Sequence, residues 1–68
     1  MEDYQKRMLA EREELKDRVE KLDAFIHSDK VESIASDKRY LLFSQFSVMQ
    51  SYLDILSMRC HLEGILAD

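Results

Sequence analysis

Four residues near the start of the chain are spaced seven apart: Tyr4, Glu11, Arg18 and Phe25. The tyrosine and the arginine among them could together bind an anionic ligand that carries a planar base. At this spacing they lie along one edge of a helix. If two copies of the helix cross antiparallel near Glu11, Tyr4 of one copy lies beside Arg18 of the other. A tyrosine ring stacks on a planar base and a guanidinium clamps phosphate. The spacing predicts paired pockets for a small phosphate-bearing ligand. The alternative is a solvated edge with Glu11 and Arg18 paired across an interface.

Three further basic residues complete the candidate ligand-binding set. Arg7 and Lys21 lie about one turn from this edge and add positive charge. Arg59 falls within an apolar region, in line with Gln45 and Tyr52 at spacing seven. It is either an interfacial ion-pair partner with a snorkelling stem, or an arginine at an axis where subunits converge on a shared anion. The full set is Tyr4, Arg7, Arg18, Lys21 and Arg59.

Residues for catalysis or metal binding are scarce. His27, Cys60 and His61 are too few for a structural zinc site, and adjacent helical positions such as Cys60 and His61 face different directions. Gly64 is the single glycine, which excludes a glycine-rich phosphate loop. We expect no enzyme, no metal and no cofactor, with Cys60 as an inert core thiol.

Two long helices are expected to position the candidate residues. Met8, Leu15 and Leu22 recur every seven residues, which predicts a helix over about residues 2–26. Four acid-first pairs at spacing four support this helix. They are Glu2–Lys6, Asp3–Arg7, Glu14–Arg18 and Asp17–Lys21.

A polar connector over residues 27–36 should hold a short helical turn near residues 30–35, capped by Ser28. Ser36 is then expected to N-cap a second helix over about residues 37–63, which ends at Gly64.

The second helix carries more apolar surface than its partner can cover. Its apolar residues fill an arc of roughly 200°, whereas one packed helix covers a stripe of only about 100°. Further copies of the chain are the simplest cover. We therefore expect an all-α helical hairpin that assembles into a homo-oligomeric bundle. The arc comprises Leu41, Leu42, Phe46, Val48, Met49, Tyr52, Leu53, Ile55, Leu56, Cys60 and Leu62.

Length and charge narrow the function classes. Sixty-eight residues allow one domain, spanning 1–68, with a small core of its own. The net charge of −4 argues against binding to DNA or RNA duplexes and to anionic membranes, but leaves room for a ligand with two or three phosphates. No apolar run reaches the length of a membrane span or of a signal sequence, and there is a single cysteine. We expect a cytoplasmic protein.

The residue pattern resembles a family of very small phage proteins that counter cyclic-oligonucleotide-based antiphage signalling, the anti-CBASS sponges. The resemblance spans roughly residues 4–59. It rests on Tyr4-x-x-Arg7, Glu13-Glu14-Leu15, Lys21-Leu22-x-x-Phe25-Ile26-x-Ser28 and Gln45-x-x-x-Met49-x-x-Tyr52-x-x-x-Leu56-x-x-Arg59.

This resemblance implies a helical hexamer that sequesters cyclic di- and trinucleotides in the host cytosol without cleaving them. Tyr4 and Arg18 match the family's cyclic-dinucleotide residues, although the familiar basic residue is lysine. Arg59 matches an arginine used for trinucleotides. The hydroxyl residue that accompanies it has no counterpart before Ser28, so dinucleotides are favoured over trinucleotides.

A rival interpretation treats the chain as a helical protein–protein interaction module. In that case the broad apolar arc of the second helix docks on a host protein and inhibits or scaffolds it.

Overall fold

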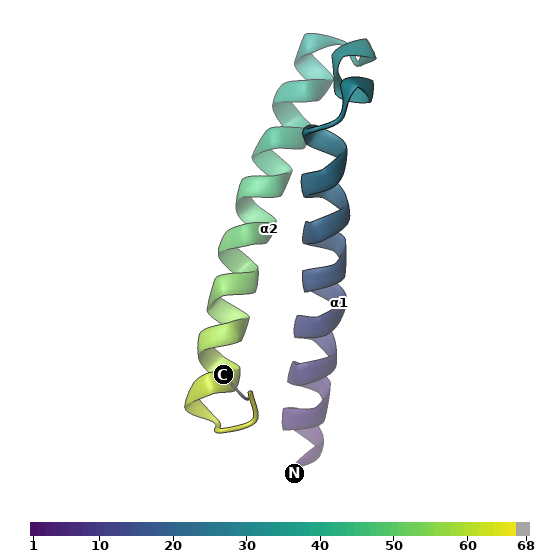
Figure 1. Cartoon of the computed structure of the whole chain (residues 1–68). Helices are drawn as coiled ribbons and strands as arrows, with labels where there is room; N and C mark the ends of the chain where they lie inside the picture. The colour runs from purple at the N-terminus through teal and green to yellow at the C-terminus, as the bar shows by residue number, and fades with distance from the viewer. Residues whose placement is uncertain (67–68) are drawn as a thin grey trace.

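The computed structural model describes residues 1–66 as an antiparallel helical hairpin measuring 45 × 19 × 16 Å (Figure 1). Helix α1 spans Asp3–Ile26, the short 3-10 helix η1 spans Asp29–Ser33, and α2 spans Ser36–Leu62. No strand occurs among the described residues. The predicted all-α hairpin is confirmed. The predicted domain of residues 1–68 includes residues 67 and 68, which lie outside the described residues.

The start of α1 agrees with the prediction to within one residue. Glu2 is the N-cap, and its backbone N–H donates to Oε1 of Gln5 at 2.8 Å. This contact satisfies one of the amide groups that a helix leaves unpaired at its first turn. At the other end, the Ser28 hydroxyl donates to the carbonyl of Phe25 at 2.6 Å. The side chain of Ser28 thus closes the end of α1 and begins the connector.

The beginning of α2 differs from the prediction by one position. Ala35, with φ −56° and ψ 146°, is the N-cap, and its carbonyl accepts the Arg39 N–H at 2.9 Å. Ser36 is instead the first residue of the helix. The backbone conformation of Ala35 therefore sets the boundary without a capping side chain. Asp37 lies in the first turn, where its charge complements the helix dipole.

The predicted stop at Gly64 is confirmed. Gly64 has a φ of +70°, a conformation that glycine adopts without a Cβ penalty. Its N–H donates to the His61 carbonyl at 3.0 Å, and the Ile65 N–H donates to the Cys60 carbonyl at 3.1 Å. These two bonds form a Schellman motif. Ile65 also packs on the core, so the motif turns the chain end back toward α1.

The core is a narrow column between the two helices. Met8, Leu15 and Val19 of α1 pack with Leu56 and Cys60 of α2, and the last two are fully buried. Cys60 is a free buried thiol, as expected. Leu22, which belongs to the predicted apolar row, is only half-buried. Leu9, Phe46, Met49, Leu53, Ile65 and Leu66 pack around this column.

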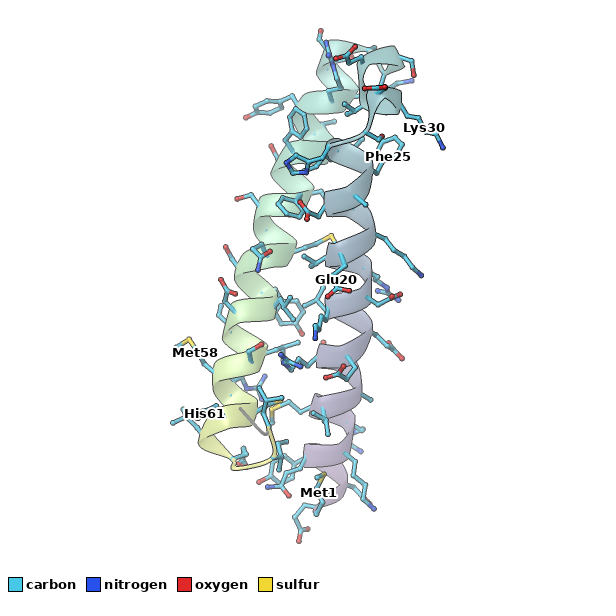
Figure 2. The ribbon with its side chains drawn as sticks, in the orientation of Figure 1. Met1, Glu20, Phe25, Lys30, Met58 and His61 are labelled. Atoms are coloured by element: carbon cyan, nitrogen blue, oxygen red, sulfur yellow. The ribbon has the colours of Figure 1, made fainter. Side chains whose placement is uncertain are left out.

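The surplus apolar surface predicted for the second helix is present. Leu41, Val48, Ile55 and Leu62, hereafter the α2 stripe, are between 54% and 86% exposed. Their seven-residue spacing places them along one line of α2. Met58 and His61, farther around the helix, point away from α1 (Figure 2). Cover of the α2 stripe by further copies of the chain stays a prediction.

Candidate ligand-binding edge

Two tyrosine–carboxylate contacts join α1 to α2. The Tyr4 hydroxyl donates to Glu63, at 2.5 Å to Oε1 and 3.1 Å to Oε2. Gln5 Nε2 also donates to Glu63 Oε1, at 3.4 Å. The Tyr52 hydroxyl donates to Oε1 of Glu11. Each contact therefore pairs a residue of α1 with one from α2 or its C-terminal end.

These contacts lie on the same edge of the hairpin, hereafter the tyrosine edge. On each helix the contacting residues lie to one side of the buried column, since successive residues are about 100° apart around the axis. Arg18 lies on this edge because it follows Glu11 by seven residues. The tyrosine edge comprises Tyr4, Glu11 and Arg18 of α1 with Tyr52, Arg59 and Glu63 of α2 and its end.

Both tyrosines on this edge are held in the protonated form. The hydrogen bond to Glu63 raises the pKa of Tyr4 above the ordinary value of 10.0, because deprotonation would remove the donor and oppose two negative charges. The hydrogen bond to Glu11 raises the pKa of Tyr52 in the same way. The positive charge of Arg59 partly opposes this effect on Tyr52. At neutral pH both rings therefore keep a neutral hydroxyl.

A small groove of about 240 Å³ opens at the end of the hairpin where the first turns of α1 lie beside the end of α2. Its lining consists of Met8, Arg59, Leu62 and Glu63. Tyr4 contacts the Glu63 carboxylate at this groove. Two residues of the predicted set, Tyr4 and Arg59, thus lie at the same end of the hairpin.

The remaining candidates lie elsewhere along α1. Arg18 is about 21 Å from Tyr4 along the helix axis, so one chain does not bring the two together. Arg7 and Arg18 are exposed and make no hydrogen bond or ion pair within residues 1–66. Lys21 pairs with Asp17 at 2.8 Å. The expected pairs Glu2–Lys6, Asp3–Arg7 and Glu14–Arg18 do not form in the described part of the chain, so Arg7 and Arg18 keep free guanidinium groups.

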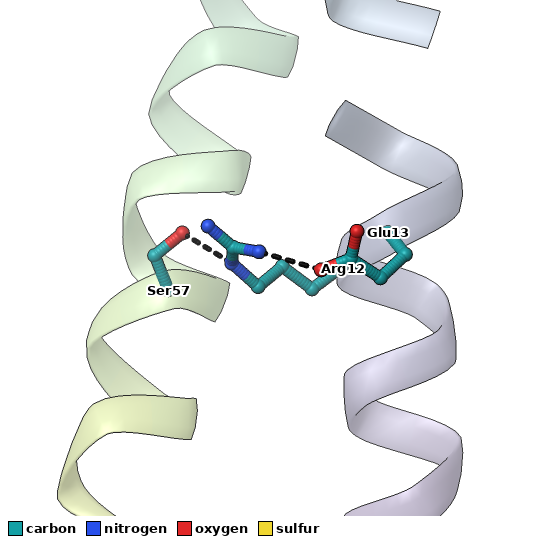
Figure 3. A network of polar contacts seen from close by, with 3 residues as sticks. All are labelled: Arg12, Glu13 and Ser57. Carbon is teal, nitrogen blue, oxygen red and sulfur yellow. Dashed lines mark hydrogen bonds and ion pairs between the residues drawn. The ribbon is translucent and has the colours of Figure 1, made fainter. Parts of the chain in front are cut away.

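The opposite edge carries a different arginine, which the sequence analysis did not single out. Arg12 donates from Nε to the Ser57 hydroxyl at 2.9 Å and from Nη1 to Glu13 at 2.7 Å (Figure 3). Its side chain is only 16% exposed. Arg12 therefore cross-links the helices, and its charge is already compensated by Glu13. The groove beside it, of about 420 Å³, is lined by Arg12, Lys16, Val19, Glu20, Asp23, Phe46, Gln50, Leu53, Asp54 and Ser57.

Glu63 is the residue of the tyrosine edge that sequence reasoning missed. It lies beyond the motifs that drew attention, and its partner Tyr4 is at the other end of the chain. The short connector could have predicted this contact, because a hairpin that turns at η1 places the first turn of α1 beside the end of α2. No group of three His, Cys, Asp or Glu residues in the described part of the chain could hold a metal ion. Neither helix within residues 1–66 has the length and apolarity needed to cross a bilayer.

Comparison with known proteins supplies the family. No curated protein and no solved structure matches the chain. One family model, described as Sequestin, matches residues 2–62 and so covers both helices and the connector. The match agrees with the resemblance to sequestering proteins, although it does not specify a ligand. The chain belongs to the Sequestin family.

Proposed function

We propose that the chain is a sponge: a protein that binds cyclic dinucleotide immune signals without cleaving them and so prevents anti-phage signalling. Membership of the Sequestin family supports sequestration as the activity. The cyclic dinucleotide comes from the resemblance of Tyr4 and Arg18 to the family's ligand residues. Such a protein acts by mass action, because stoichiometric binding lowers the free signal below the threshold of its effector.

The observation that carries this proposal is the composition of the tyrosine edge. It combines the ring of Tyr4 with the guanidinium groups of Arg18 and Arg59. Neither guanidinium group forms an ion pair within residues 1–66. An aromatic surface and unpaired cations match a ligand that alternates planar bases with phosphates. In the proposal Tyr4 stacks on a base and Arg18 holds a phosphate. Arg7 and Lys21 add positive charge.

The pockets are proposed to form between copies of the chain. The α2 stripe lies next to Tyr52 and Arg59 on the surface of α2, as the helical spacing requires. A second copy packed on the stripe would place the tyrosine edge at the rim of the interface. Antiparallel copies could then supply Tyr4 and Arg18 to one ligand from two chains. The resemblance implies a hexamer.

Recovery of intact ligand tests the proposal. Purified protein is mixed with a cyclic dinucleotide, free ligand is removed by filtration, and the protein is then denatured by heat. We expect the nucleotide to stay with the protein and to be released chemically unchanged, in a fixed ratio to the chain. Failure to retain any cyclic dinucleotide, or release of a linear product, would contradict a sponge.

A second candidate function rests on the α2 stripe itself. Four large apolar residues more than half exposed form the kind of surface that docks on another protein. As an interaction module the chain would inhibit or scaffold a host protein. This alternative predicts an assembly that varies with protein concentration and ignores cyclic nucleotides, whereas the sponge predicts a closed assembly of fixed size.

A further inference from the structure

The Tyr4 side chain is held at both of its ends. Its backbone belongs to the first turn of α1, and its hydroxyl donates to both oxygens of Glu63, the C-cap of α2, at 2.5 Å and 3.1 Å (Figure 1). Two torsion angles set the direction of a tyrosine side chain, so holding both ends fixes the direction of the ring. Tyr4 nevertheless stays 49% exposed, which leaves ring surface accessible to a base.

Glu63 is itself fixed by its neighbours. Its backbone N–H donates to the Arg59 carbonyl at 3.1 Å at the end of α2. On its side chain, Oε1 also accepts Nε2 of Gln5 at 3.4 Å. The amide group of Gln5 is oriented in turn, because its Oε1 accepts the Glu2 N–H at 2.8 Å. The Tyr4 hydroxyl therefore meets a carboxylate whose backbone and side chain are both held.

The negative charge of Glu63 opposes a phosphate-bearing ligand, and its carboxylate already accepts hydrogen bonds from Tyr4 and Gln5. Any gain that it brings to binding must therefore act through Tyr4. A side chain that is ordered before the ligand arrives loses no freedom on binding, which corresponds to about threefold to tenfold in affinity. Building on the proposed function, we propose that Glu63 is a positioning residue that orders the Tyr4 ring for stacking on a base.

The sign of the change in affinity tests this role. Binding of a cyclic dinucleotide is measured by calorimetry for the native chain, Glu63→Ala and Glu63→Gln. Loss of a negative charge alone would strengthen the binding of an anion, whereas loss of positioning weakens it. We expect Glu63→Ala to bind about threefold to tenfold more weakly. Glu63→Gln should bind at least as tightly as the native chain, because its amide oxygen still accepts the Tyr4 hydroxyl.

A double-mutant cycle distinguishes positioning from direct contact with the ligand. Tyr4→Phe keeps the ring but removes its contact with Glu63, so it should weaken binding as Glu63→Ala does. Both changes act on one contact, so the combined variant should bind no more weakly than the weaker single variant. Additive losses would place the Tyr4 hydroxyl on the ligand and overturn the role of Glu63.

A measurement without ligand follows the ring itself. NMR couplings between the α and β protons of Tyr4 should report one rotamer in the native chain and in Glu63→Gln, and averaged rotamers in Glu63→Ala. Glu32→Ala is the matched control, because Glu32 is an exposed carboxylate on η1 at the other end of the hairpin. It should change neither the affinity nor the couplings. Circular dichroism checks that every variant stays helical.

The outcomes separate the two proposals. If Glu63→Ala binds as tightly as the native chain or more tightly, or if Tyr4 keeps one rotamer in this variant, Glu63 has no positioning role and the sponge stays in place. Failure of the native chain to bind any cyclic dinucleotide would overturn the proposed function and the role of Glu63 with it.

Discussion

The Tyr4 hydroxyl and the Glu63 carboxylate connect the first turn of α1 to the end of α2 across 59 positions of sequence, at 2.5 Å. The contact is the outermost of several polar links between α1 and α2 or its end. The hydrogen bonds Gln5–Glu63, Arg12–Ser57 and Tyr52–Glu11 are further links of this kind. Because Tyr4 is 49% exposed, its contact with Glu63 is open to solvent and to a ligand that competes for either group.

Alkaline titration should reveal the two tyrosine–carboxylate contacts. Their folded-state pKa values lie above 10.0, so the contacts stabilise the fold below that pH and lose this effect as pH rises through the raised pKa values. NMR titration of the tyrosine ring carbons should show Tyr4 and Tyr52 ionising above the value for free tyrosine. Replacing Glu63 by Gln should lower the pKa of Tyr4 alone, since an amide carries no charge. An unchanged Tyr4 titration in Glu63→Gln would exclude the contact in solution.

Leu56→Ala should strongly destabilise the hairpin. Leu56 is fully buried at the centre of the core, and such truncations cost about 2–5 kcal/mol. A domain of this size has little stability to spare, so we expect a large fraction of the variant to be unfolded at 25 °C by circular dichroism.

Met58→Ala is the control for this truncation. Met58 is 64% exposed on the same helix, and its replacement should leave the thermal midpoint nearly unchanged. Equal losses in the two variants would show that the packing of α2 on α1 differs from that described.

Ile55→Glu should dissociate the assembly without unfolding the chain. Ile55 lies in the α2 stripe and is 54% exposed in one chain, so a charge there is tolerated by the hairpin but not by an apolar interface. Sedimentation velocity should show the native assembly replaced by smaller species with unchanged helicity. Ser47→Glu, on an exposed position away from the α2 stripe, should keep the native size. A monomeric native chain would contradict the proposed interface.

Arg18→Gln should weaken the binding of a cyclic dinucleotide by about tenfold or more, whereas Lys16→Gln should not. Both changes remove one positive charge from α1, but Arg18 lies on the tyrosine edge and Lys16 lines the opposite groove. Loss of a charge-assisted phosphate contact corresponds to about tenfold or more in affinity. Equilibrium dialysis measures both variants. Similar effects of the two changes would reduce the role of Arg18 to general electrostatics.

The sequence predicted most of the fold because helical periodicity is a local signal. The row of Met8 and Leu15 marked the buried face of α1, and Gly64 marked the end of α2, since both depend on neighbouring residues. The apolar excess of α2 was also predicted, because one helix cannot cover so wide an arc. The cap at Ala35 was missed because it depends on backbone conformation and not on a capping side chain.

The site was predicted less completely because its contacts cross between the helices. Tyr4 and Arg59 were identified from their types and spacing, but their shared position at one end depends on the length of the connector. The contacts Tyr4–Glu63 and Arg12–Ser57 likewise depend on how far α2 is shifted along α1, which the connector sets. The expected pair Glu14–Arg18 did not form, since an exposed ion pair gains too little free energy to order two long side chains.

Native mass spectrometry of the purified protein, with and without a mixture of cyclic di- and trinucleotides, tests the central claim most directly. A sponge predicts one assembly of fixed size that gains whole-number multiples of a cyclic dinucleotide mass, and Tyr4→Ala should keep that size while losing the added mass. An assembly that gains no nucleotide mass under any of these conditions would contradict the account and favour a protein partner for the α2 stripe.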